Sequence, residues 1–116
     1  MPSGFGQAEA DLLKREGGLN PNDAGRGPTN RGINQAANPD VDVRNLTPDQ
    51  TRDLYRDRYW NPVVTGDMSR PMQNVAFDTS VLMGPEAAKG LVGQANGDPS
   101  KLLQLRDARL RGIGQE

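Results

Sequence analysis

A short amphipathic helix that ends at a pair of glycines constrains the fold of this chain more than any other feature. Its apolar residues recur at helical spacing, with charged residues between them, at Phe5, Ala8, Leu12 and Leu13. Gly17-Gly18 follows directly, and a glycine just past the last periodic residue ends a helix. We therefore predict a helix from Phe5 to Glu16, with Glu16 on the last turn, where the chain turns away.

Other helix breakers divide the rest of the chain into short segments. Residues 19–28 are almost all turn formers and predict a short hairpin or a loop. Thr47-Pro48-Asp49-Gln50 predicts a helix start, because threonine can cap, proline suits the first position and glutamine completes a capping box. We expect helices over 30–37 (capped by Thr29), 47–60, 71–83 (with Met72, Val75, Ala76, Val81 and Leu82 inward), 86–95 and 99–111. The sum is a mainly α fold.

Length and composition predict one domain with a thin core. The 116 residues suit a single domain over 1–116, and only 34% of them are hydrophobic. We expect such a domain to be stabilised by contacts with other parts, such as a missing C-terminal part or other subunits. The net charge of −1 gives no reason to expect nucleic acid. No apolar run is long enough for a membrane span, and residues 1–6 lack the features of a signal peptide.

The chain contains no histidine and no cysteine, which excludes several kinds of catalysis. Zinc hydrolases need imidazole ligands, and Cys/His or Ser-His-Asp hydrolases need a histidine base. We expect no metal and no cofactor. If the chain catalyses a reaction by itself, carboxylates must carry the protons, and Glu16 is the first candidate.

Several motifs together resemble one known family. They are Glu16-Gly17-Gly18, Asn20 to Gly25, Thr29 to Ile33, Leu46 to Thr51, Leu54-Tyr55-Arg56, Tyr59-Trp60, and Ala76 to Val81 with Gly84. In this order and spacing, over residues 5 to 95, they resemble the glycoside hydrolase family 108 muramidases. The resemblance implies a lysozyme-like helical fold with room for a small β-hairpin. It also implies cleavage of the bond from N-acetylmuramic acid to N-acetylglucosamine in peptidoglycan, with Glu16 as the catalytic acid.

The resemblance extends to further candidate residues. Asp23 and Thr29 share the Glu, Asp, Thr order of phage lysozymes, in which they would manage the attacking water and the anomeric centre. Each residue has a structural alternative: a surface glutamate at 16, a loop-shaping aspartate at 23, and a helix cap at 29. Predicted substrate contacts are Gly17, Gly18, Asn30 and Trp60, although Trp60, like Tyr55 and Tyr59, also suits a core. We expect Asp78 to pair with an arginine or a backbone amide.

Two classes of function remain open. The first is a peptidoglycan hydrolase in a phage virion, bound to tail proteins and acting in the bacterial periplasm or wall; a free endolysin, held in the host cytoplasm before release, is its variant. The second is a catalytically impaired, lysozyme-fold structural subunit of a phage tail. Leu19 and Leu82 depart from the family pattern and motivate the second class. A DNA-binding helix-turn-helix module is disfavoured by the near-neutral charge.

Overall fold

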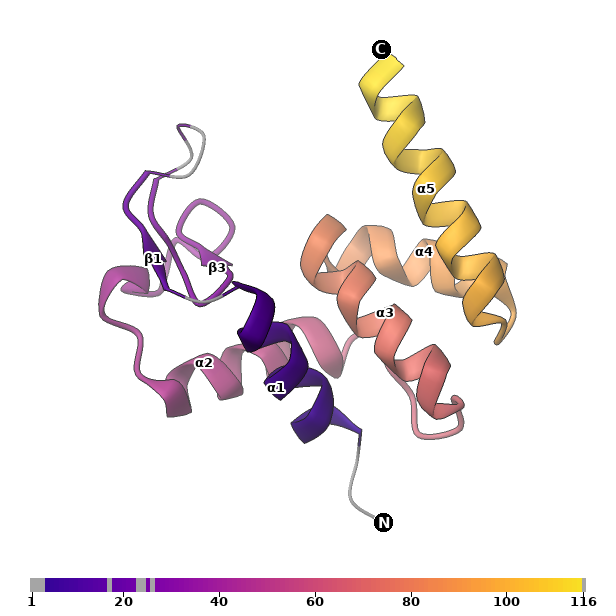
Figure 1. Cartoon of the computed structure of the whole chain (residues 1–116), viewed down its shortest axis with the longest axis horizontal. Coiled ribbons are helices and arrows are strands. Elements are labelled where there is room, and N and C mark those ends of the chain that lie inside the picture. The colour runs from indigo at the N-terminus through magenta and orange to yellow at the C-terminus, as the bar shows by residue number, and fades with distance from the viewer. Residues whose placement is uncertain (1–3, 17, 23–24, 26, 116) are drawn as a thin grey trace. The chain divides into compact units, whose positions relative to one another are not determined.

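The computed structural model describes residues 4–16, 18–22, 25 and 27–115, and the side chains of these except 15–16 and 113–115. The mainly α fold is confirmed, with a small antiparallel sheet (Figure 1). The chain divides into two compact units, which are Gly6–Tyr55, and Met1–Phe5 together with Arg56–Glu116.

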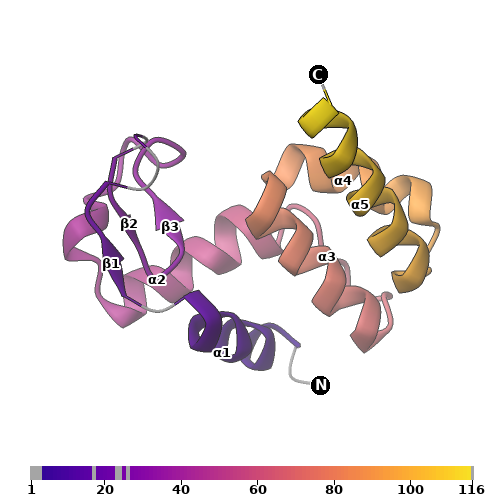
Figure 2. The ribbon, with the colours of Figure 1, turned by 45° about the horizontal axis from the view of Figure 1, so that its top comes forward.

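The unit Gly6–Tyr55 contains helix α1, the sheet and helix α2 (Figure 2). Helix α1 (Phe5–Glu16) has the predicted bounds. The sheet has three short antiparallel strands in the order β1 (Leu19–Asn20), β2 (Thr29–Asn30) and β3 (Ile33–Asn34). Leu19 is opposite Asn30, and Thr29 is opposite Asn34. Of the hairpin or loop predicted over 19–28, the structure shows a hairpin, whose second strand begins at Thr29, and a second hairpin follows it.

The helix predicted over residues 30–37 is wrong, because a tight β-turn occupies its start. Arg31 and Gly32 join β2 to β3 and have φ angles of 52° and 81°. Two successive residues with positive φ make a type I′ turn, whose twist matches a β-hairpin, whereas a right-handed helix needs negative φ. Thr29 is accordingly a strand residue and caps no helix.

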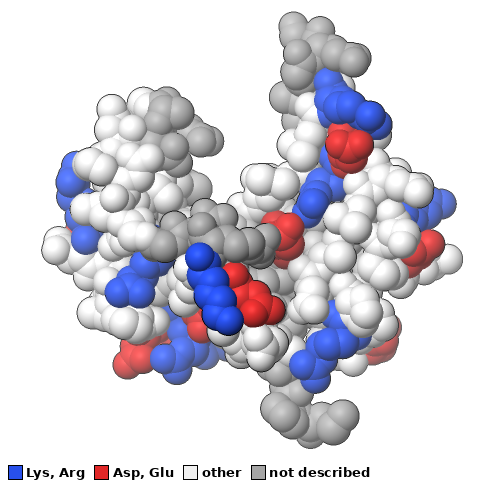
Figure 3. Space-filling model, in the orientation of Figure 1, with Lys and Arg blue, Asp and Glu red and all other residues white. Residues whose placement is uncertain are grey.

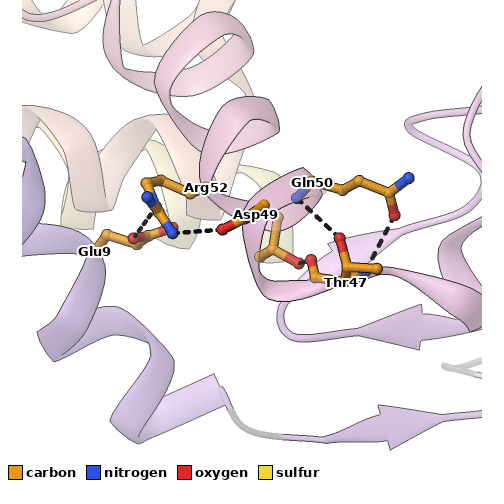
Figure 4. Close-up of polar contacts among 6 residues, drawn as sticks. Glu9, Thr47, Asp49, Gln50 and Arg52 are labelled. Atoms are coloured by element: carbon orange, nitrogen blue, oxygen red, sulfur yellow. Dashed lines mark hydrogen bonds and ion pairs between the residues drawn. The ribbon is translucent and has the colours of Figure 1, made fainter.

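Helix α2 (Pro48–Leu54) begins with the predicted capping box (Figure 4). The Thr47 hydroxyl accepts a hydrogen bond from the Gln50 amide at 3.2 Å, and the Gln50 side chain accepts one from the Thr47 amide at 3.0 Å. The chain continues without a break into a π-helical segment, η3 (Tyr55–Trp60), so the predicted extent to Trp60 is confirmed. A 3-10 turn, η2 (Val43–Asn45), precedes this helix.

The second unit is built from three helices that pack on one another (Figure 1). They are α3 (Arg70–Met83), α4 (Pro85–Ala95) and α5 (Pro99–Gln115). Gly84, with φ of 92°, separates α3 from α4, and Asn96 and Gly97, both with positive φ, end α4. These breaks lie where the sequence predicted them.

An aromatic cluster forms part of the core of this unit. Phe5, Trp60 and Phe77 meet edge to face, with ring centroids 5.3 to 5.9 Å apart. The buried stripe of α3 consists of Met72, Gln73, Ala76, Phe77, Thr79 and Ser80. The inward prediction for Met72 and Ala76 is thus confirmed. Leu82 is 56% exposed, and Val75 and Val81 are half-buried. The buried face of α3 is thus rotated about the helix axis from the face that the apolar residues indicated.

Candidate functional site

Glu16 is the last residue of α1, as predicted. Its side chain, together with the predicted site residues Gly17 and Asp23, lies outside the described part of the structure. The structure describes the backbone on both sides of Glu16: helix α1, which leads to it, and strand β1, which begins three residues later.

The chain after Glu16 is joined to the middle strand of the sheet. Gly18 is exposed, and its carbonyl accepts a hydrogen bond from the Arg31 amide at 3.4 Å. The pairing of Leu19 with Asn30 continues the ladder from there. The segment that leaves α1 is therefore held against the β2–β3 turn by backbone hydrogen bonds.

Thr29 lies on β2 and faces its cross-strand neighbour. Its half-buried hydroxyl accepts a hydrogen bond from the Asn34 side-chain amide at 2.9 Å. This bond joins β2 to β3 through side chains as well as through the backbone ladder. The catalytic role of Thr29 stays a prediction.

Asn30 ties the sheet to the following turn. Its side-chain nitrogen donates to the carbonyl oxygens of Val43, at 3.0 Å, and Arg44, at 3.3 Å. Val43 is fully buried in η2, so these bonds fix the far side of the strand to a packed element. The Asn30 side chain thus has a structural role in joining β2 to η2. Its contact with substrate stays a prediction.

The aromatic residues are mostly core residues. Trp60 is 6% exposed and is enclosed by Phe5 and Phe77, so its burial favours the core alternative over the predicted sugar contact. Tyr55 is fully buried, and its hydroxyl donates to the Arg31 carbonyl. This bond could not be predicted from the sequence, because it joins residues 24 apart and no local pattern marks it.

Charges of both signs lie close together on the face of the molecule that Figure 3 shows, where Lys and Arg side chains lie beside Asp and Glu side chains. The predicted pairing of Asp78 is confirmed, because Arg106 donates to its carboxylate at 2.8 Å. The Thr65 hydroxyl, followed by the Asp67 backbone amide, holds the pKa of the Asp67 carboxyl below its ordinary value. Among the described residues, no group of carboxylates could hold a metal ion.

Comparison with known families identifies the class of protein. The sequence model of the Glycosyl hydrolase 108 family matches residues 10–84, which is more than half of the 116 residues. The chain belongs to the Glycosyl hydrolase 108 family. It is a glycoside hydrolase of the lysozyme-like class that degrades peptidoglycan. The matched region begins inside α1 and includes Glu16, the sheet and α3.

A solved structure supports the fold. The structure of Brucella abortus SagA superposes with a TM-score of 0.83, over 95% of this chain and 81% of that chain, at 24% sequence identity. The lysozyme-like fold expected from the sequence is confirmed. The comparison with curated proteins found no match. No helix in the described ranges combines the length and the apolar character that a membrane crossing requires.

Proposed function

We propose that this glycoside hydrolase cleaves the bond from N-acetylmuramic acid to N-acetylglucosamine, with Glu16 as the general acid. The observation that carries the proposal is the place of Glu16 at the end of α1, two residues before Gly18, whose carbonyl accepts a hydrogen bond from the Arg31 amide. A proton donor must be held steadily against the glycosidic oxygen, and a helix end followed by a paired strand provides such a position.

The position also suits an acid chemically. The C-terminal end of a helix carries a partial negative charge, which disfavours an ionised carboxylate and so raises its pKa. A raised pKa keeps the proton on a glutamic acid until the leaving oxygen needs it.

Asp23 and Thr29 complete the proposed machinery. Asp23 would stay ionised and either orient the attacking water or stabilise the positive charge at the anomeric carbon. Thr29 would bind that water through its hydroxyl. An inverting reaction needs about 6.5–9.5 Å between the two carboxyl groups, and a retaining reaction about 5–5.5 Å. The configuration of the first-formed product, followed by NMR, distinguishes these routes.

The experiment is product analysis on purified peptidoglycan. The digest is reduced with borohydride and its new sugar ends are identified by mass spectrometry for the wild type, Glu16→Gln and the control Glu86→Gln. Glu86 is an exposed glutamate at the start of α4, and its carboxylate lies 3.3 Å from the Lys89 ammonium one helical turn later. We expect reduced muramic acid ends from the wild type and the control, and about 100-fold fewer from Glu16→Gln.

Two results would contradict the proposal. Reduced glucosamine ends would show that the other bond of the repeat is cleaved. Equal activity of Glu16→Gln and wild type would remove Glu16 from the reaction. No cleavage by any variant would favour the alternative of an impaired structural subunit.

The proposed setting is a phage virion, with the enzyme bound to tail proteins and acting on the wall during infection. It rests on the resemblance to phage muramidases and on the small share of hydrophobic residues, 34%, which suits a subunit that packs on others. Mass spectrometry of purified particles tests it. Detection of the chain in purified particles in stoichiometric amounts supports the virion setting. A chain that is absent from particles and appears in the medium only when the host cell lyses supports a free endolysin.

A further inference from the structure

We infer that Tyr55 is a positioning residue for Glu16. The inference rests on the proposed role of Glu16, and it concerns how the backbone on both sides of that residue is held. The contacts that link Tyr55 to Glu16 all lie within the unit Gly6–Tyr55.

The backbone of the turn between β2 and β3 is strained at Arg31. Arg31 has φ of 52°, a left-handed conformation that costs energy for any residue with a Cβ atom. The usual residues at this place in a type I′ turn are asparagine, aspartate and glycine. An arginine therefore adopts this turn only if other contacts hold it.

The contact that holds the turn comes from Tyr55. The Tyr55 hydroxyl donates a hydrogen bond to the Arg31 carbonyl, and the Tyr55 ring is fully buried. The backbone of Tyr55 is fixed as well, since its amide bonds to the carbonyls of Thr51 and Arg52 at the end of α2. A rigid side chain on a helix thus supports the turn.

The same turn is linked to the segment that follows Glu16. The Arg31 amide donates to the Gly18 carbonyl, so the same residue that Tyr55 holds also holds the start of β1. Gly18 is two residues after Glu16, and two Cα–Cα steps span at most about 7.6 Å. A displacement of the turn therefore also displaces Gly18, two residues from Glu16.

Helix α1, which ends at Glu16, is itself tied to α2 through Glu9 and Arg52 (Figure 4). Glu9, on α1, is only 11% exposed in its side chain, and its carboxylate lies 3.9 Å from the Arg52 guanidinium. Asp49 holds Arg52 at 2.8 Å from the preceding turn. Residues 52 and 55 are three apart on a continuous helix and so share a face. One helix face therefore fixes α1 before Glu16 and, through Tyr55, the strand after it.

The test uses Tyr55→Phe, which removes one oxygen and keeps the ring. The control is Glu86→Gln, a change at an exposed residue of α4. Turnover is measured as reducing-end release from soluble glycan strands, with the folded fraction measured by circular dichroism. We expect kcat to fall about 10- to 100-fold in Tyr55→Phe, with KM within about twofold, because a small displacement of a reacting group lowers the rate without removing substrate contacts. Glu86→Gln should keep the wild-type values.

A rescue separates positioning from simple packing. Glycine adopts positive φ without strain, so adding Arg31→Gly to Tyr55→Phe should restore the turn and return kcat to within about threefold of wild type. Wild-type kcat in Tyr55→Phe overturns the inference, and so does a double variant that folds but stays slow. If Tyr55→Phe does not fold, the double variant alone decides: folded and active supports the inference, and unfolded or inactive overturns it.

Glu16→Gln in the same assay separates this inference from the proposed function. An inactive Glu16→Gln beside a fully active Tyr55→Phe rejects the positioning role alone. An active Glu16→Gln rejects both.

Discussion

The ion pair between Asp78 on α3 and Arg106 on α5 is expected to contribute measurably to stability. The two side chains are 32% and 20% exposed and their hydrogen bond is 2.8 Å long. Fully exposed pairs contribute about 0.2–1 kcal/mol, and hydrogen bonds to charged groups about 1.5–3 kcal/mol. Because a fifth to a third of each side chain is exposed to water, this pair lies between the two cases. We therefore expect a coupling free energy of about 1 kcal/mol between Asp78 and Arg106.

A double-mutant cycle with Asp78→Ala and Arg106→Ala measures this coupling by urea denaturation. The matched control is Glu86 with Lys89, whose side chains are 88% and 46% exposed and 3.3 Å apart on one helix. We expect about 0.3 kcal/mol for that pair. A coupling for Asp78 and Arg106 no larger than the control value would refute the reasoning from burial.

Three other predictions concern local structure. Thr47→Ala should lower the free energy of unfolding by about 1 kcal/mol, measured in urea, because it removes the cap of α2; an unchanged midpoint would contradict this. Gly32→Ala should lower the free energy of unfolding by about 1 kcal/mol or more, because Gly32 has φ of 81°. Gly90→Ala, on α4 with open space around the new methyl group, should raise it by about 0.5–1 kcal/mol. Equal effects of the two substitutions would contradict this prediction. Thr65→Val should raise the pKa of Asp67 toward its ordinary value, as followed by NMR titration. Because folding lowers this pKa, the carboxylate stabilises the fold above its ordinary pKa, and the effect is lost as pH falls through the lowered one; a pKa that does not move would exclude Thr65 as the main cause.

The helix boundaries could be predicted because their signals are local. Gly17-Gly18 ends α1, the capping box begins α2, and Gly84 and Asn96 separate the last three helices. Each of these signals acts within about one turn of helix, so the sequence pattern contains the whole cause.

The sheet could be predicted only in part, because distant residues decide it. Residues 30–37 look helical in isolation, and Arg31-Gly32 is not one of the strong hairpin dipeptides. The turn is held by Tyr55, 24 residues away, and the strand by carbonyls of residues 43 and 44. No window of neighbouring residues contains these contacts, and they overrode the local helical preference.

The candidate site, too, could be predicted only where its signals are local. The place of Glu16 at the end of α1 was predicted from the adjacent glycines and is confirmed. The frame around it was not, since it depends on the Arg31 bond to Gly18 and on the Tyr55 hydroxyl. On α3, Leu82 was expected inward, but the polar Gln73, Thr79 and Ser80 share the buried stripe and shift it away from Leu82.

The proton transfer by Glu16 is tested most directly by comparing two leaving groups in Glu16→Gln. One substrate is a glycan strand, whose sugar oxygen needs a proton to leave. The other is a muramyl disaccharide with a dinitrophenyl leaving group, which departs without one. We predict that Glu16→Gln loses about 100-fold or more of the wild-type rate on glycan strands and keeps nearly the wild-type rate on the aryl substrate. Equal losses on both substrates, or full activity on glycan strands, would contradict the role of Glu16 as the general acid.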